Sequence, residues 1–512
     1  MKIQPGSAVL AATAAIALAA VSVPPATAAP GGNPNNPKKF TKAVTAEAVM
    51  GHLEQFQAIA DANGGNRAAG TSGYEESARY VERTLQAAGY QTWRQPFSFT
   101  YTETTTSLEE VSPTARSIDQ RPMSYGPDTP VGGITGELVQ PATVTGCDAS
   151  EWGDTDATGK IALVSRGACS FSQKSLAAGE AGASALIIYN NEPGMLNGTL
   201  SAPNEGYVPT TGITQDDGQA LAAEAAAGPV VVTFNLQSLV EERETFNVLA
   251  ETTTGRDDNV VMIGSHLDGA QEGPGMSDNG SGAAANLETA VQMAKVNKVN
   301  NKIRFAFWGA EERGLVGARH YVNDLVENDP QALGDIALYL NYDMVGSPNY
   351  IIGVYDADQS TYPAPVPVPE GSAAVEKVFT DYYDSVDQPW VDTEFSGRSD
   401  YQPFIDNGVP SSGLFTGADG VKTPEEVELF GGTAGLLYDP NYHTAADDID
   451  NINPEAIAIN TKAMAHAAIV FAYDTSMVNG ETSPGKSGKI KPGNQGKAKK
   501  VGAQAAPHLA AS

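Results

Sequence analysis

Segments typical of strands alternate with segments typical of helices from about residue 246 to residue 474. Short apolar runs predict strands at Phe246–Ala250, Val260–Gly264, Ile303–Trp308, Ile336–Asn341 and Ser412–Phe415. Longer stretches with apolar residues at helical spacing predict helices at Ser281–Lys295, Gly314–Glu327, Ala373–Ser385 and Pro454–Tyr473. Such alternation builds a mostly parallel sheet with helices on both faces. We therefore expect an α/β fold whose functional loops follow the carboxyl ends of the strands.

The part of the chain before residue 105 also contains helix and strand patterns. Apolar spacing predicts a helix over residues 44–63. A second helix is predicted over Tyr74–Ala88, with Ser72 as its N-cap and Gly89 at its carboxyl end. Alternating aromatic residues over Thr92–Tyr101 predict a strand. This part is therefore also α/β in character.

Residues from about 105 to 240 have a different texture, with short β-like segments between Gly- and Pro-rich turns. Within them, Ile161–Ser165, Phe171–Ala181 and Ala185–Tyr189 predict a compact β-α-β unit. The unit holds no histidine, and we interpret Arg166 and Lys174 as solvated surface residues. Nothing in this unit points to catalysis.

This middle segment resembles a protease-associated domain. The resemblance rests on the RGxCxF pattern at Arg166–Phe171, on Lys174, and on the AGAxAxIIYNN pattern that ends at Asn191. Such domains are inserted into, or appended to, secreted and lysosomal peptidases. The resemblance implies an inserted β-rich module at residues 106–239 that serves as a lid or a recognition module.

A Gly-rich loop, Gly264–Gly282, directly follows the apolar run Asn259–Ile263. It reads GSHLDGAQEGPGMSDNGSG and holds one imidazole, His266, and three acids, of which Asp278 lies farthest along the loop. The glycines let the loop fold back on itself. A strand end can therefore present a histidine and a distant carboxylate to one point.

Histidines and acids recur where other strands of the alternating segment should end or loops should turn. Together with the loop residues they form the set His266, Asp278, Glu311, Glu312, Asp343 and His443. Two imidazoles and several carboxylates without a thiolate suit zinc held by nitrogen and oxygen ligands. Even five ligands from this set are too many for one catalytic zinc, and they suit two ions that share a bridging carboxylate.

At these residues the chain resembles the secreted bacterial aminopeptidases of the leucine-aminopeptidase type, which carry two co-catalytic zinc ions. The motifs are SHLDG, SDNGSGAA, FWGAEERGLVGARHY, LNYDMVGSPN, GRSDYQPF, GLFTGA and YHTAADD, and NRAAGTSGY at 66–74 belongs with them. The resemblance implies a zinc exopeptidase fold, a mostly parallel mixed sheet flanked by helices, built from residues 44–105 and 240–475. It also implies two Zn²⁺ per chain and peptide or protein N-termini as substrate.

The resemblance implies a role for each residue of the set. His266 binds one zinc and His443 binds the other, while Asp278 bridges the two ions. Glu312 and Asp343 complete the two sites, and the sequence leaves open which of them belongs with which histidine.

Further roles follow from the same resemblance. Glu311 is the general base that takes a proton from the attacking water and passes it to the leaving amine. Tyr442 stabilises the tetrahedral oxyanion, unless it is an ordinary packed tyrosine. Asp268 accepts the second ring N–H of His266. Asp278-Asn279 matches a position at which the family has a non-proline cis peptide bond.

The substrate pocket is less sharply marked. Arg398 matches a substrate-orienting position, but a surface salt bridge explains it equally well. Met344 and Phe415 correspond to the apolar side-chain pocket, although core residues would look the same in sequence. Family members often bracket the YH dipeptide with a disulfide, which Asn441 and Ala446 cannot form here. Many also bind a structural Ca²⁺, for which we find no clear site.

Charge and the chain ends indicate where the protein works. A formal charge of −30 argues against binding to nucleic acid or to an anionic membrane. Residues 1–29 read as a signal peptide rather than an N-terminal anchor, and we see no later stretch that could span a membrane. We expect a secreted monomer, a linker or pro-segment at 30–43, a disordered basic tail at 476–512, and a disulfide between Cys147 and Cys169.

The leading prediction is thus a secreted metallo-aminopeptidase that removes a large apolar N-terminal residue. A related dizinc carboxypeptidase is the first alternative, but it needs a cationic cluster for the terminal carboxylate, and Arg398 is the one obvious candidate. Glutaminyl cyclisation uses one zinc, whereas this chain keeps the ligands of two. A non-catalytic secreted binding protein would be expected to lack Glu311 or a ligand, and none is missing.

Overall fold

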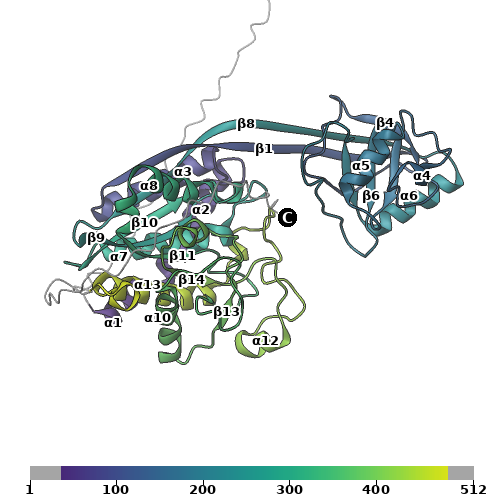
Figure 1. Ribbon diagram of the computed structural model, residues 1–512. Coiled ribbons are helices and arrows are strands. Elements are labelled where there is room, and N and C mark those ends of the chain that lie inside the picture. Colours follow the sequence, from purple (N-terminus) through teal and green to yellow (C-terminus); the bar gives the residue numbers. More distant parts are fainter. Residues whose placement is uncertain (1–35, 482–512) are drawn as a thin grey trace, which may run out of the picture.

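The computed structural model describes residues 36–481. The expected signal peptide, the first residues of the expected linker and the tail beyond residue 481 lie outside the described residues. Two bodies stand apart in Figure 1, and a pair of long strands, β1 and β8, joins them. The larger body holds the residues expected to be catalytic, and the smaller one is the middle segment.

The larger body is built on a mixed sheet with the strand order β1-β8-β10-β9-β11-β14-β12-β13. The strands are β1 Thr92–Ser112, β8 Val231–Glu251, β9 Arg256–His266, β10 Asn301–Trp308, β11 Ile336–Tyr342, β12 Gly353–Tyr355, β13 Val391–Thr393 and β14 Ser411–Phe415. The central strands β10, β9, β11 and β14 run parallel. Their carboxyl ends therefore share one edge, where an α/β sheet places its functional loops.

Helices cover both faces of this sheet, as the alternating pattern predicts. They are α2 Ala46–Ala62, α3 Ser72–Ala88, α7 Ser281–Met293, α8 Val316–Asn328, α9 Pro330–Gly334, α10 Ser372–Ser385, α11 Gln402–Asp406, α12 Pro424–Phe430 and α13 Pro454–Tyr473. Along β9, Val261 and Ile263 enter one apolar core, whereas Val260 and Met262 enter the other. This period of two is what a strand buried on both faces requires.

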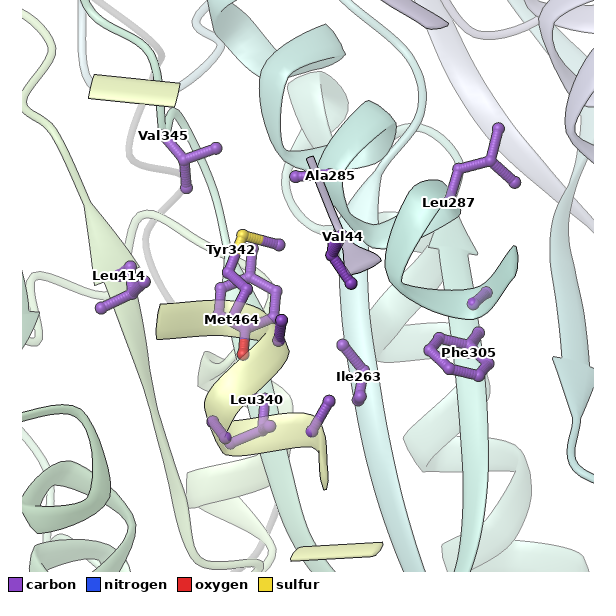
Figure 2. Packing of buried hydrophobic residues seen from close by; sticks show 14 of the residues in the cluster. Val44, Ile263, Ala285, Leu287, Phe305, Leu340, Tyr342, Val345, Leu414 and Met464 are labelled. Carbon is purple, nitrogen blue, oxygen red and sulfur yellow. The ribbon is translucent and has the colours of Figure 1, made fainter. Parts of the chain in front are cut away.

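The larger core lies between the sheet and the helices α2, α3, α7, α10 and α13. Figure 2 shows Ile263, Phe305 and Leu340 on neighbouring strands, with Met464 of α13 and Ala285 of α7 packed near them. All five side chains are fully buried. Burial of this kind contributes roughly 1.5–3 kcal/mol for each large apolar side chain, and it fixes the strands whose ends carry the site.

The smaller body has its own apolar cores and a mostly parallel sheet. Its elements are β2 Arg116–Ser117, β3 Gln120–Pro122, β4 Ile134–Val139, α4 Ala149–Trp152, β5 Ile161–Ser165, α5 Phe171–Glu180, β6 Ala185–Tyr189, β7 Thr210–Ile213 and α6 Gln215–Ala227. The predicted β-α-β unit corresponds to β5, α5 and β6. The predicted disulfide between Cys147 and Cys169 is present.

The strands β1 and β8 pair over almost their whole length. Between the two bodies, residues 102–105 of β1 and 238–240 of β8 are exposed to solvent. The ribbon there has no apolar core on either face. The predicted domain limits at 105/106 and 239/240 both fall in this exposed stretch and stay a prediction.

Some local expectations are wrong. Residues 37–43 do not form a linker, because they fold into the helix α1 (Pro37–Ala43), whose Phe40 is fully buried. Residues 476–479 do not belong to a disordered tail, because they form the short helix α14 (Ser476–Asn479). The N-cap of α3 is Thr71 rather than Ser72, and its hydroxyl accepts the N–H of Tyr74 at 3.4 Å.

Two further corrections concern side-chain environment. Lys174 is not a solvated residue: it is fully buried, and its Nζ donates to the carbonyl oxygen of Thr145 at 2.6 Å. The helix α13 is long and apolar enough to cross a membrane, contrary to our expectation that no later stretch would be. In its most apolar window 67% is buried inside the protein, so it is placed as a core helix.

Candidate metal centre

The predicted metal ligands lie at the carboxyl edge of the parallel strands. His266 is the last residue of β9, and Asp343 directly follows β11. Glu311 and Glu312 begin a short 3-10 helix, Glu311–Arg313, just after β10. Because β10, β9 and β11 are neighbours, their ends bring these side chains together, as the sequence predicts.

Asp278 lies between the two histidines and presents a different oxygen to each. Its Oδ1 is 3.2 Å from Nε2 of His266, and its Oδ2 is 3.1 Å from Nε2 of His443. Asp343 Oδ1 approaches the same nitrogen of His266 at 3.1 Å, whereas Glu312 Oε2 approaches that of His443 at 2.9 Å. In the structure Asp343 therefore lies with His266, and Glu312 lies with His443.

Glu311 lies beside this group. Its Oε2 is 4.0 Å from His266 Nε2, and its side chain is 10% exposed. Burial raises the pKa of Glu311 well above its usual range, and the nearby His266 only partly opposes this. Glu311 thus faces the same space as the ligand atoms without adopting either histidine as a close partner.

The pKa values of the acids and histidines in this site favour the binding of cations. Burial opposes the charged form of His443, but hydrogen bonds to Asp278 and Glu312 raise its pKa to about 11. Burial and the charge of Asp278 raise the pKa of Glu312 to about 7. Burial also opposes ionisation of Asp278, yet hydrogen bonds from both histidines hold its pKa well below its usual range. Protons thus occupy positions between these side chains that a metal ion can take.

The residues fit zinc. His266, Asp278 and Asp343 form one group of possible ligand atoms, and Asp278, Glu312 and His443 form another; the ligand atoms of each group lie within 4.8 Å of one another. The Oε1 atom of Glu312 is buried without a hydrogen-bond partner. Imidazole nitrogens with carboxylate oxygens are a donor set that zinc accepts.

Asp268 supports the site differently from the prediction. The acceptor for His266 Nδ1 is the backbone carbonyl of Asp268 at 3.0 Å, whereas its carboxylate lies 3.9 Å away. The carboxylate instead accepts the backbone N–H groups of Glu311 and Glu312, at 3.2 and 3.4 Å. Asp268 therefore ties the histidine strand to the turn that carries the two glutamates.

Three side chains around Asp343 escaped the sequence reasoning. Ser399 donates to Asp343 Oδ2 at 2.6 Å, and Asn341 Nδ2 donates to Ser399 at 2.8 Å. Asp400 is 1% exposed, and neither of its carboxylate oxygens has a protein hydrogen-bond partner. Burial raises the pKa of Asp400 well above its usual range. Ser399 and Asp400 lie in the GRSD motif, which was a usable signal, but we read only its arginine.

Tyr442 and Arg398 lie at the outer side of the site. The Tyr442 ring stacks on His443 with centroids 3.9 Å apart. Arg398 forms an ion pair with Asp419 at 3.0 Å, and its Nη2 donates to the Tyr442 hydroxyl at 3.4 Å. Arg398 thus forms the exposed salt bridge of one interpretation. It also contacts Tyr442, the predicted oxyanion residue, so the structure leaves the substrate-orienting interpretation open.

The backbone is strained around the ligands. His443, Met344 and Ala310 all have positive φ, at 55°, 53° and 56°, a conformation that non-glycine residues rarely adopt outside functional sites. Asp278-Asn279 is a cis peptide bond, as the resemblance implies. A Cβ on Gly273 would collide with the carbonyl oxygen of Thr444. The glycine therefore allows the loop Gly264–Gly282, called the ligand loop below, to pack against the loop that carries His443.

The expected pocket residues lie next to the ligands. Met344 follows Asp343 and is buried, and its carbonyl accepts the N–H of Thr416 at 2.8 Å. Phe415, which precedes Thr416, is partly buried, with its ring stacked near Tyr355. Met344 thus lies in the loop after β11, and Phe415 ends the neighbouring strand β14 at the same edge of the sheet.

A separate acidic group lies outside this site. Asp356, Asp358 and Glu376 place ligand-type oxygens near one another. Glu376 accepts the N–H groups of Ala357 and Asp358, at 2.8 and 2.9 Å. Asp356 and Asp358 both accept the N–H of Ser360 at 2.9 Å. The three carboxylates thus support their own loop, and the group gives no independent evidence for Ca²⁺.

Two family models match the chain. The model for peptidase family M28 matches residues 247–468, and the model for the PA domain matches residues 134–221. The first match covers the strands and loops that carry all the ligands, and the second covers most of the smaller body.

Similar proteins agree with both matches. The chain is 43% identical to the probable leucine aminopeptidase 2 of Trichophyton verrucosum, over 86% of each chain. It is 43% identical to the probable lipoprotein aminopeptidase LpqL of Mycobacterium tuberculosis, over 85% of this chain and 87% of that protein. Among solved structures, an aminopeptidase from Aneurinibacillus sp. strain AM-1 superposes with a TM-score of 0.60 at 27% identity, over 85% of this chain and 95% of that chain. BSAP, a zinc aminopeptidase from Bacillus subtilis, gives 0.61 at 26% identity, over 83% and 94%.

Proposed function

This chain belongs to peptidase family M28 and carries a PA domain, and from that premise we propose that it is a two-zinc aminopeptidase that removes a large apolar, leucine-like residue from peptide N-termini outside the cell. The coarser statement, that it is a zinc-dependent aminopeptidase, rests on the family and on its similarity to leucine aminopeptidases and to zinc aminopeptidase structures. The number of ions, the residue preference, the secretion and a monomeric state belong to the proposal.

The observation that carries the proposal is the position of Asp278. Its two oxygens face two different histidines at 3.2 and 3.1 Å, and each histidine has a carboxylate of its own. A carboxylate between two such groups is the arrangement that a pair of metal ions roughly 3.5–4 Å apart requires. A single catalytic zinc would leave one histidine group without a purpose.

Each side chain then has a definite task. When bound, zinc supplies Lewis acidity, which acidifies water at the site and polarises the scissile carbonyl. Glu311, buried beside the ligand atoms, accepts the proton of the attacking water and returns it to the leaving amine. Burial and the charge of Asp278 raise the pKa of Tyr442 far above its usual range, so its hydroxyl stays protonated and can donate to the developing oxyanion.

The charges around the substrate favour an aminopeptidase over the carboxypeptidase alternative. The carboxylates of the site present negative charge to a free α-amine. Arg398, the candidate for holding a terminal carboxylate, is paired with Asp419 through both of its terminal nitrogens, at 3.0 and 3.3 Å. Its charge is thus largely compensated before a substrate arrives.

The proposal is tested with leucine p-nitroanilide and its N-acetylated form, each with and without a zinc chelator. We expect release of p-nitroaniline from the free-amine compound alone, lost on chelation and restored by added zinc. Cleavage of the acetylated compound would contradict recognition of the amine. Inactivity on both, with cleavage of peptides from their C-termini, would establish the carboxypeptidase instead.

A further inference from the structure

A fully buried arginine, Arg67, lies against the loop that carries His266 and Asp278. Its guanidinium donates three hydrogen bonds to backbone carbonyls: Nη1 to Leu267 at 2.5 Å, Nε to Pro274 at 2.9 Å and Nη2 to Gly275 at 2.5 Å. No carboxylate among the described residues lies within 4.0 Å of it. A buried cation without a close counter-ion is costly, so this arrangement requires a reason.

The three carbonyls lie at two places in the ligand loop, one just after His266 and two shortly before Asp278. Leu267 directly follows His266, and Gly275 lies three residues before Asp278. A guanidinium is planar and holds its donors in a fixed fork, which no other side chain offers. Arg67 therefore fixes the spacing between the strand end that presents the histidine and the turn that presents the bridging carboxylate.

A buried acid holds the same turn through its amides. Asp447, 2% exposed, accepts the N–H of Ser277 at 2.7 Å and that of Asp278 at 3.1 Å. The carbonyls of the loop thus face a guanidinium, and the amides next to the bridging residue face a carboxyl group. The turn is held by side-chain hydrogen bonds on both sides.

The contact between Arg67 and Leu267 is also linked to the proposed general base, Glu311. Asp268 follows Leu267, and its carboxylate accepts the backbone N–H groups of Glu311 and Glu312. A shift of the Leu267 carbonyl would therefore move Asp268 and the turn that carries Glu311. Burial lowers the pKa of Arg67, and the charges of four acids oppose this effect: Asp268, Asp447, Asp278 and Glu312.

We propose that Arg67 is a positioning residue that sets the geometry of the two metal sites before metal arrives, by fixing the loop between His266 and Asp278. The inference rests on the proposed two-zinc function. Arg67 forms hydrogen bonds to backbone carbonyls of the loop and to no ligand side chain among the described residues. It therefore acts only through the loop backbone.

The first test compares zinc binding by the wild-type protein and by Arg67→Lys and Arg67→Ala. Competition with a chromophoric chelator gives the dissociation constant of each ion, and circular dichroism reports folding. Loss of a residue that orients metal ligands costs about 10–100-fold in metal affinity, and we expect a loss of that size for both ions in both variants. With zinc at saturating concentration, kcat should fall while KM stays near the wild-type value.

Arg304 provides a matched control. It is a largely buried arginine on β10 that pairs with Glu251 at 2.9 Å and donates to Tyr321 at 2.8 Å, away from the ligand loop. Arg304→Lys should lower the melting temperature without changing zinc affinity by more than about twofold. This separates a general loss of stability from a loss of ligand geometry.

Chemical rescue gives a sharper readout. Guanidinium chloride at low, non-denaturing concentration should restore zinc affinity to Arg67→Ala, and urea at the same concentration should not, because it is uncharged. A folded Arg67→Ala protein that binds both ions with wild-type affinity would overturn the inference. Failure of the wild-type protein to bind two ions would instead overturn the proposed function.

Hydrogen exchange tests the same point without relying on a variant that must fold. In the metal-free wild-type protein, the amides of Ser277, Asp278 and Gly280 should be protected, since Arg67 and Asp447 already hold the loop. Exchange of these amides at the rate of an unstructured chain, with protection appearing only after zinc is added, would contradict a loop that is set in advance.

Discussion

At the scale of the residue, the site assigns different work to similar side chains by their surroundings. Glu311 and Glu312 are neighbours in sequence, yet Glu312 lies 2.9 Å from His443, while Glu311 approaches no histidine nitrogen closer than 4.0 Å. Neighbouring side chains in a turn point in different directions, so one can hold a metal while the other accepts a proton. The motif shows both acids, but only the contacts tell them apart.

Glu311→Gln tests this division. The amide keeps the shape of the side chain but cannot take a proton, so kcat should fall by about 10²–10⁴-fold, while two zinc ions remain bound. The measurement is steady-state hydrolysis of leucine p-nitroanilide alongside metal analysis. Glu272→Gln, an exposed acid in the ligand loop, is the control and should stay near wild type. Activity of Glu311→Gln within a few fold of wild type would remove Glu311 from its role.

The affinity for zinc should depend steeply on pH. In the metal-free protein the pKa of Glu312 is raised to about 7 and that of His443 to about 11. Both groups therefore hold protons at pH 6, and zinc must displace them. Affinity should weaken as pH falls from 8 to 6, by on the order of 100-fold or more at the His443 group. Chelator competition at several pH values measures this, and a dissociation constant that does not change with pH would contradict the assignment.

At the residue scale, the sequence reveals a site residue when the chemical type of its side chain is itself the signal. The candidate ligands stand out in the sequence because His, Asp and Glu in strand-end loops are a chemical signal in themselves. Arg67 and Asp447 lie within quoted motifs but received no role, because their partners are backbone atoms of a distant loop. The true task of Asp268 was hidden for the same reason.

At the scale of the element, periodicity predicted the buried strands and the long helices well. The strand β1 extends to Ser112, beyond the predicted end at Tyr101. The sequence pattern stops short because the outer half of the strand is rich in Thr and Glu and lacks apolar alternation. The helix α1 was missed because only Phe40 anchors it within a Pro- and Asn-rich stretch. Weakly patterned elements depend on tertiary partners that a local pattern does not contain.

Phe40→Ala tests whether α1 is part of the catalytic body. Its ring is fully buried in the larger core, and loss of such a side chain costs about 3–5 kcal/mol. The free energy of unfolding, measured with denaturant, should fall by that amount. Lys39→Ala, at an exposed position of the same helix, should leave it nearly unchanged. Equal stability of both variants would return residues 37–43 to the predicted linker.

At the scale of the whole molecule, the chain separates chemistry from the added module. The proposed ligands and the proposed general base lie on the larger body, and the smaller body has cores of its own. The strands β1 and β8 link them through an exposed ribbon (Figure 1). We therefore expect the PA domain to take no part in bond cleavage.

Excision of the smaller body tests that separation. Thr105 and Gln237 face each other across the ribbon, so an Asn-Gly turn can replace the residues between them. Because the larger core stays intact, kcat/KM for leucine p-nitroanilide should remain within about threefold of wild type. Loss of activity in a folded, zinc-loaded protein would show that the PA domain contributes to the site itself.

The central claim is that Asp278 joins two metal sites, and a zinc titration of the metal-free protein tests it most directly. We predict two equivalents per wild-type chain. His443→Ala should lose one of them, whereas Asp278→Asn should weaken both, because its two oxygens face different histidines. One equivalent in the wild-type protein, or an Asp278→Asn variant in which only one ion is affected, would contradict the two-zinc site.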